Sequence, residues 1–208
     1  MKKIIILSTF LLAVPVFAGE SNATSAAAEA KYTAVIDERS QKIVDALELK
    51  DANTAKKVHE IIMAQYRELN DWHNAHDPEI KAAKHNQEAI AKIEAPLKKL
   101  HDEYLAKLGQ YLSPAQIETV KDKMTYGKVE FTYKGYLAQY PNLSEENKAE
   151  ILRMLKEARE QAIDAGSAEE KTAIFQRYKG RINNYLSKQG IHPEKHKPEP
   201  AKTNSSEK

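Results

Sequence analysis

Hydrophobic residues recur every three or four positions over most of the chain, from about residue 32 to residue 190. This spacing places them on one face of successive amphipathic helices. It is clearest over 52–74, which carries Val58, Ile61, Ile62, Leu69 and Trp72. The pattern predicts an all-α fold, an elongated antiparallel helical bundle.

The segment 78–112 carries an apolar stripe that passes Pro96 without losing register. A proline inside a helix removes a hydrogen bond and usually kinks the helix. Because the register is the same on both sides of Pro96, the sequence predicts one long kinked helix. At about 1.5 Å per residue it would reach roughly 50 Å.

Three serines mark the expected starts of further helices. Ser113 is followed by proline and, three residues on, by glutamine, whereas Ser144 and Ser167 are followed by pairs of glutamates. A serine hydroxyl caps a helix N-terminus and an acidic first turn favours the helix dipole. Gly166 and Gly190 are expected to end the helices on either side of Ser167, which predicts an α-hairpin with a two-residue joint.

One segment, 124–140, departs from the helical pattern. It contains two glycines and four tyrosines, and its apolar and polar residues alternate between Val129 and Tyr133. Alternation with a period of two is typical of an extended strand. The sequence therefore predicts a short extended or hairpin insertion near 126–136.

The two ends of the chain differ from its middle. Residues 1–18 have two lysines, an apolar stretch and a small-x-small end, the pattern of a signal peptide. The apolar stretch is shorter than the roughly 20 residues that span a bilayer, so we expect no membrane span after cleavage. We expect a flexible spacer over 19–31, a single helical domain over 32–190, a disordered tail over 191–208, and a periplasmic or secreted protein.

Composition narrows the function classes. Of 32 basic residues, Lys2 and Lys3 belong to the leader, so the remaining basic residues equal the 30 acidic ones. A neutral chain lacks the basic surface that nucleic-acid binding needs. The absence of cysteine excludes disulfides, thiol nucleophiles, iron–sulfur clusters and cysteine-based zinc sites.

Two groups of residues are candidates for ligand binding. Tyrosine rings can stack on sugars or peptide side chains, or pack against the core. Basic residues of the last helix can hold the carboxylate or sulfate of an acidic polymer, or remain a solvated face paired with acidic neighbours. The candidates are Tyr126, Tyr133, Tyr136, Arg177, Lys179, Arg181 and Asn184.

A third group is a candidate metal site. His73 and His76 are separated by one helical turn and Asp77 follows directly. Such a pair with a carboxylate can bind a divalent metal, although solvated histidines at a helix C-terminus also explain the pattern. Catalytic residues and a cofactor are not identified, because the sequence has no nucleophile elbow and no phosphate loop.

Five stretches share a pattern with a known family. They read YTAVIxxR at 32–39, QYRxLN at 65–70, LSPxQ and VKDxMTYG over 112–127, EARExAxDAGS at 157–167 and YKGRINNYLSxxG at 178–190. In this combination the chain resembles domain-of-unknown-function family 3826. The resemblance implies an exported bacterial protein that accompanies the degradation of plant cell-wall polysaccharide, and it implies no catalytic residues.

A second resemblance is local. Leu-Ser-x-x-Gln at 112–116 and Leu-Ser-x-x-Asn at 143–147 are similar to the Leu-Thr-x-x-Gln repeats of small helical periplasmic stress chaperones. Serine replaces threonine in both copies. Helix capping alone would also generate this motif.

These observations lead to one hypothesis and two alternatives. The first is an exported helical binding or interaction protein, associated with pectin-type polysaccharide utilisation, whose partner is a glycan or another protein. The alternatives are a lyase or hydrolase acting on acidic polysaccharide, and a periplasmic metal-binding or chaperone-like protein. The sequence leaves open whether the chain forms a homodimer.

Overall fold

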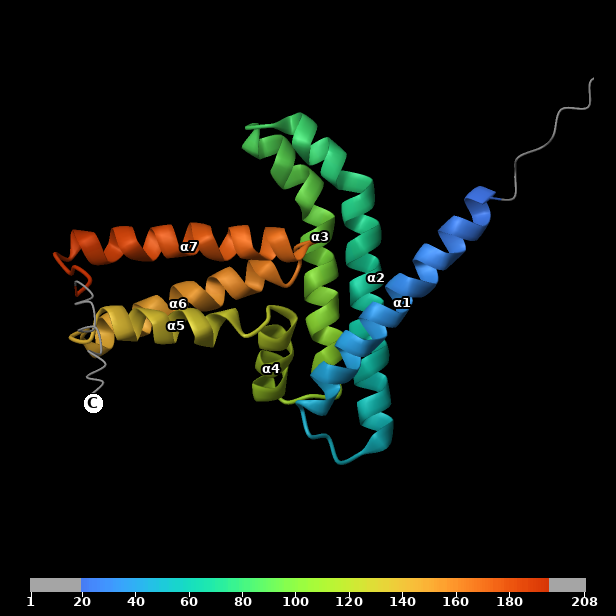
Figure 1. Ribbon diagram of the computed structural model, residues 1–208, viewed down its shortest axis with the longest axis horizontal. Coiled ribbons are helices and arrows are strands. Elements are labelled where there is room, and N and C mark those ends of the chain that lie inside the picture. Colours follow the sequence, from blue (N-terminus) through green and yellow to red (C-terminus); the bar gives the residue numbers. More distant parts are fainter. Residues whose placement is uncertain (1–19, 195–208) are drawn as a thin grey trace, which may run out of the picture.

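The computed structural model describes residues 20–194, so the expected signal peptide and most of the expected tail lie outside the described residues. The all-α prediction is confirmed: within this range the chain forms seven helices and no strand (Figure 1). They are α1 (Glu20–Asp45), α2 (Ala52–Ala83), α3 (Gln87–Gly109), α4 (Pro114–Met124), α5 (Lys128–Gln139), α6 (Glu145–Ala162) and α7 (Ala168–Lys188). None of the helices within 20–194 has the length and hydrophobicity of a membrane span.

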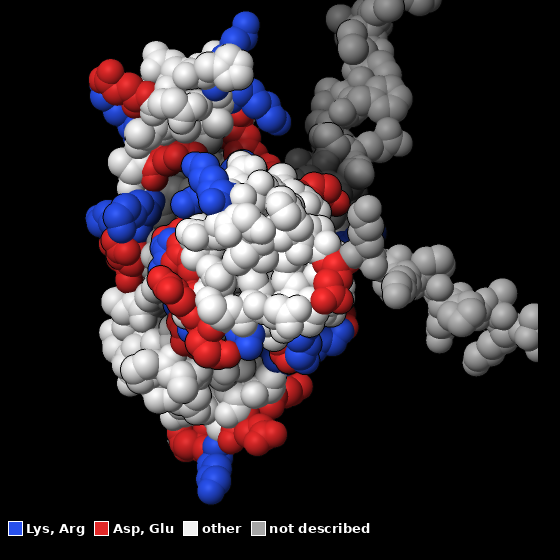
Figure 2. Space-filling model, turned by 90° about the vertical axis from the view of Figure 1, so that its left-hand side faces the viewer, with Lys and Arg blue, Asp and Glu red and all other residues white. Residues whose placement is uncertain are grey.

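The helices form two packed groups (Figure 1). In the first, α2 and α3 form a long hairpin, α1 crosses α2, and α4 lies at the junction with the second group. In the second, α5, α6 and α7 project sideways from the hairpin. Figure 2 views the free end of this second group and shows acidic and basic side chains mixed around an uncharged end.

Each group has its own hydrophobic core. The first core is centred on Val58, Ile62, Tyr104, Leu108 and Val120. The second core is centred on Ile151, Leu155, Phe175, Ile182 and Leu186. The apolar positions that recur along the sequence are therefore divided between two cores.

The far half of the α2–α3 hairpin belongs to neither core. Between Trp72 and Tyr104 no residue is fully buried. Ile80, Ile90 and Leu97 in this stretch are half-buried. The hairpin tip therefore extends beyond the packed interior, as Figure 1 shows.

The two groups are joined by an ion-pair network on α4 and α6. The Arg159 side chain is only 2% exposed, and its guanidinium contacts Asp122 at 2.7 Å, Glu160 at 3.0 Å and Glu118. Lys121 also contacts Glu160, at 2.9 Å. Although partial burial would raise the pKa of Glu118, hydrogen bonds from Lys121 and Arg159 lower it to about 2.

The expected helix starts are found where the sequence placed them. Ser113, Ser144 and Ser167 are the N-cap residues of α4, α6 and α7. Ser113 and Gln116 form a reciprocal capping box. This capping explains both motifs that resemble chaperone repeats.

The single helix predicted over 78–112 is wrong. Helix α2 continues through Pro78 to Ala83, and a new helix starts after Asn86. Lys84 has a positive φ of 50°, and the Asn86 side chain accepts a hydrogen bond from the Ala89 amide. Asparagine is a strong N-cap, and this local signal outweighs the continuous apolar stripe. Helix α3 does pass Pro96 without ending.

The extended insertion predicted near 126–136 is also wrong, because α5 occupies Lys128–Gln139. Tyr126 and Gly127 both have positive φ, of 59° and 64°, and make the turn between α4 and α5. Val129 and Tyr136 are buried on one face of α5. Residues seven positions apart lie on the same face of a helix. The alternation of apolar and polar residues that starts at Val129 is therefore part of a helical pattern.

Two boundaries differ from the sequence-based expectation. Helix α1 begins at Glu20, so residues 20–31, which were expected to be a spacer, are helical. Helix α6 ends at Ala162, and five residues rather than two connect it to α7. This connection, 163–167, forms part of the site described next.

Candidate functional site

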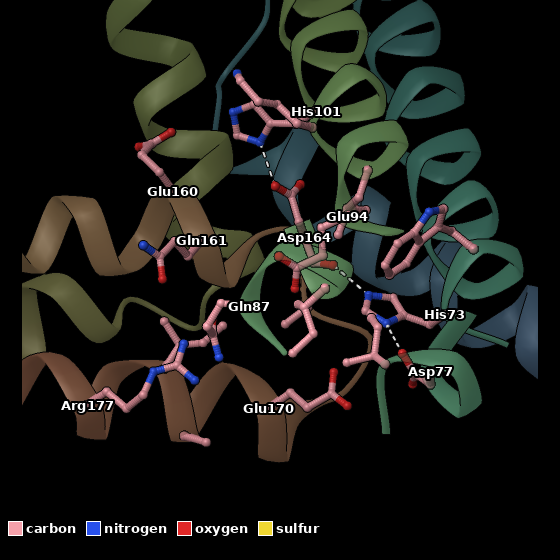
Figure 3. A pocket seen from close by; sticks show the side chains of 18 residues that line it. His73, Asp77, Gln87, Glu94, His101, Glu160, Gln161, Asp164, Glu170 and Arg177 are labelled. Atoms are coloured by element: carbon pink, nitrogen blue, oxygen red, sulfur yellow. Dashed lines mark hydrogen bonds and ion pairs between the residues drawn. The ribbon is translucent and has the colours of Figure 1, made fainter. Parts of the chain in front are cut away.

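A cleft of about 900 Å³ separates the far half of the α2–α3 hairpin from α6 and α7 (Figure 3). Its apolar wall consists of Trp72, Ile80, Ile90, Leu97 and Ile174. Its polar lining includes His73, Asp77, Gln87, Glu94, Lys98, His101, Glu160, Gln161, Asp164, Glu170 and Arg177. Apolar surface combined with a few convergent polar groups is typical of a ligand site.

Two histidines hold the α6–α7 connection at the floor of the cleft. The Nδ1 atom of His101 on α3 lies 2.8 Å from the Asp164 carboxylate. The Nε2 atom of His73 on α2 lies 2.8 Å from the Asp164 backbone carbonyl, and its Nδ1 atom lies 2.9 Å from Asp77. We call His73, Asp77, His101 and Asp164 the histidine clamp; Figure 3 shows it.

Gly166 allows the connection to approach the clamp closely. It was expected to end a helix, but α6 ends earlier, at Ala162, and Gly166 does not have a positive φ. A Cβ atom at this position would lie 2.7 Å from Cγ of His73. Gly166 is therefore required for the close approach between the connection and α2.

Burial and ion pairing set the charges of the clamp. Burial raises the pKa of Asp164, and the hydrogen bond from His101 opposes that rise. The same hydrogen bond raises the pKa of His101. Behind the connection, the buried Lys171 donates hydrogen bonds to the carbonyls of Ala162 and Ile163, and burial lowers its pKa to about 8.

The charged groups of the cleft are unevenly paired. Asp77 and Asp164 face histidines, while Glu160 binds Arg159 and Lys121. Lys98 pairs with Asp102. Within 20–194, the groups that line the cleft without an ion-pair partner are Glu94, Glu170 and Arg177. The cleft can therefore accept hydrogen bonds from hydroxyl groups through carboxylates and donate them through one guanidinium.

The tyrosines predicted from 126–136 do not line this cleft. Tyr136 is buried in the second core and its hydroxyl donates to the Asn183 side chain at 2.8 Å and the Lys179 carbonyl at 3.1 Å. Tyr133 packs against the same core. Tyr126 is 52% exposed at the α4–α5 turn. Tyr133 and Tyr136 therefore pack against the core, whereas Tyr126 is exposed outside this cleft.

The basic candidates of the last helix separate into different environments. Arg177 lines the cleft. Arg181 lies over the Tyr178 ring, 4.5 Å from its centroid, and 3.7 Å from Glu157. Lys179 is half-buried and Asn184 is exposed outside the cleft. Of the four, the structure brings Arg177 alone into the same cleft as His73.

The predicted metal ligands do not converge. The His76 ring stacks on Trp72 with 4.8 Å between centroids, and its Nδ1 atom lies 2.8 Å from the Trp72 carbonyl. His73 and Asp77 bind each other. Among residues 20–194 no three histidine, aspartate or glutamate side chains are grouped as metal ligands. The structure therefore does not group His73, His76 and Asp77 as metal ligands.

Sequence reasoning missed His101, Asp164 and Glu94. Glu94, Lys98 and His101 have the spacing of one polar helix face, and Asp164 precedes Gly166 in a helix connection. These local patterns could have marked each residue as a candidate. Their meeting depends on contacts across more than 60 residues, which no local pattern contains.

The family comparison covers most of the chain. Residues 33–204 match the model of the family described as protein of unknown function, DUF3826. A search of curated proteins gave no match.

Proposed function

The chain belongs to family DUF3826, and on the basis of its cleft we propose that it is an exported protein that binds plant cell-wall glycan. The ligand we propose is an acidic, pectin-type oligosaccharide. The observation that carries this proposal is Arg177, which has no ion-pair partner within 20–194, on a cleft wall that also presents the Glu94 and Glu170 carboxylates and apolar side chains.

Each part of such a ligand has a matching group in the cleft. The C–H faces of sugar rings pack on apolar side chains such as Ile90, Leu97 and Ile174. Sugar hydroxyls donate hydrogen bonds to Glu94 and Glu170. A uronate carboxylate forms a bidentate pair with Arg177. The carboxylates of the cleft repel other negative charges, so they limit how many sugars of a bound oligosaccharide can be uronates.

Calorimetric titration of the mature chain with galacturonate oligomers and with neutral galactose oligomers of equal length tests this proposal. We expect saturable binding of the acidic oligomers, weakened about tenfold or more by Arg177→Gln, because a charge-assisted bidentate pair is lost. Arg153→Gln is the matched control, since Arg153 lies on α6 outside this cleft. Absence of saturable binding to both oligomer types would contradict the proposal.

A second candidate function is a glycan-active enzyme, favoured by the His101–Asp164 pair. Within the described chain Nδ1 of His101 binds the carboxylate, while Nε2 has no hydrogen-bond partner. In a lyase, such a nitrogen would take the C5 proton of a uronate as the bond from C4 to the leaving oxygen breaks. Mass spectrometry of the same oligomers after long incubation with the protein tests this candidate function. Unchanged oligomers would show that the protein does not cleave them and would leave binding as the proposed function.

A further inference from the structure

Three charged side chains of the cleft are available to a ligand. Glu94, Glu170 and Arg177 line the cleft without an ion-pair partner within 20–194, whereas the other charged groups of the lining contact partners in the protein. Exposed carboxylates and guanidinium groups are ionised at neutral pH. The cleft therefore offers a ligand one positive charge and two negative charges.

On the α7 wall the positive and the negative group are separated along the helix. Glu170, Ile174 and Arg177 line the cleft at spacings of four and three residues, so they lie on one helix face. Two helical turns, about 10.5 Å, separate the Cα atoms of Glu170 and Arg177. The Glu170 carboxylate accepts a hydrogen bond from the Gly166 amide at 2.9 Å, which holds it toward the α6–α7 connection. Figure 3 shows the two side chains at separate places on this wall.

The α3 wall also combines apolar side chains with a carboxylate. Ile90, Glu94 and Leu97 line the cleft from one face of α3. Ile90 and Leu97 are half-buried, so part of each side chain remains available for contact with a ligand. A sugar ring that packs on these two side chains has Glu94 at its edge, where the carboxylate accepts hydrogen bonds from hydroxyl groups.

These positions treat charged and uncharged sugars differently. An ionised uronate is attracted to Arg177, but at the other positions its charge faces Glu94 or Glu170, and like charges repel. A neutral sugar is not repelled there. The same holds for a uronate whose carboxyl group carries a methyl ester, because the ester has no charge.

We propose that the cleft prefers glycans with few acidic groups: it binds one ionised uronate at Arg177 and uncharged sugars beside it, and Glu94 and Glu170 exclude a second ionised uronate. The ligand class is a pectin-type oligosaccharide in which most uronates are methyl-esterified. This inference rests on the proposed function, because it specifies which acidic oligosaccharide the same cleft prefers.

Calorimetric titration of the mature chain with three galacturonate hexamers at neutral pH tests the inference. The first hexamer has all its carboxylates free, the second has a single free carboxylate with methyl esters on the other sugars, and the third is fully esterified. We expect the second hexamer to bind about fivefold or more tightly than either of the others. Added salt should reduce both differences, because it screens exposed charges.

Substitutions that remove a charge but keep the side-chain shape assign the effect to residues. Glu94→Gln and Glu170→Gln should each raise the affinity for the fully ionised hexamer about threefold or more, and change the affinity for the single-carboxylate hexamer less. Arg177→Gln should remove the advantage of the single-carboxylate hexamer over the fully esterified one. Glu169→Gln is the matched control: Glu169 is exposed in the same first turn of α7 as Glu170 but does not line the cleft, so its affinities should equal those of wild type.

The order of affinities in wild type decides the inference even if a variant does not fold. A fully ionised hexamer that binds as tightly as the single-carboxylate hexamer overturns the inference and leaves the proposed function standing. Equal binding of the single-carboxylate and fully esterified hexamers overturns the placement of the uronate at Arg177. Absence of saturable binding to all three hexamers contradicts the proposed function itself.

Discussion

Replacing Tyr136 with alanine will lower the free energy of unfolding by about 3–5 kcal/mol, the range for truncating a buried aromatic ring. The Tyr136 ring is 4% exposed in the second core, and its hydroxyl binds the Asn183 side chain and the Lys179 carbonyl. The substitution leaves a cavity and removes a donor from two acceptors. Urea denaturation followed by circular dichroism measures this loss.

Tyr126→Ala is the matched control, because its ring is 52% exposed in the turn before the same helix. We expect a change within about 0.5 kcal/mol. The pair separates packing from binding for the tyrosines that the sequence singled out. A Tyr136→Ala protein with wild-type stability and no glycan binding would contradict the packing role.

Arg159→Met will lower the free energy of unfolding by about 3 kcal/mol, which is the second large effect that we expect. Breaking a buried ion pair by removing one partner typically costs 3–5 kcal/mol. We expect the lower end, because Glu118, Asp122 and Glu160 remain 36–43% exposed and keep part of their hydration. Their mutual repulsion acts at the junction of the two helix groups, so the thermal transition should also become broader.

Arg153→Met provides the comparison for this variant. Arg153 lies on the same helix and binds Glu150 and Glu157, but at an exposed position. Exposed ion pairs contribute little to stability, so we expect no measurable change. An equal loss in both variants would show that burial of Arg159 is not the cause.

Acid titration adds a second measurement for Arg159. The pKa of Glu118 is lowered to about 2. Its ionised carboxylate therefore stabilises the folded protein above about pH 4.5, and this stabilisation is lost as pH falls toward 2. Without Arg159 this pKa rises, and the loss of stability over that range becomes smaller. A slope identical to wild type would contradict the assigned role of Arg159.

The helices were predictable where the signal is local. The serines at 113, 144 and 167 cap helices as expected, since an N-cap needs contacts within three residues only. The errors arose where two local signals compete. Asn86 starts a new helix inside the apolar stripe of 78–112, and the left-handed turn at Tyr126 and Gly127 was read as the start of an extended segment.

Some residues of the candidate site could be predicted one by one from the sequence, but their arrangement could not. His73 and Asp77 were singled out for metal binding, and Arg177 was singled out for binding a carboxylate; all three line the cleft. The sequence marked His73 as a metal ligand, whereas in the structure its Nε2 atom contacts the Asp164 carbonyl. That contact spans 91 residues and depends on how two cores pack against each other. Helical periodicity identifies buried faces but does not specify their partners.

The hairpin tip that belongs to neither core has a consequence for how the molecule unfolds. A segment with few buried apolar contacts opens at a smaller free energy than the core to which it is attached. One wall of the cleft can therefore separate, re-form or adjust to an occupant while both interiors stay intact. The molecule thus combines a rigid wall, made by α6 and α7, with a compliant wall made by the far half of α2 and α3.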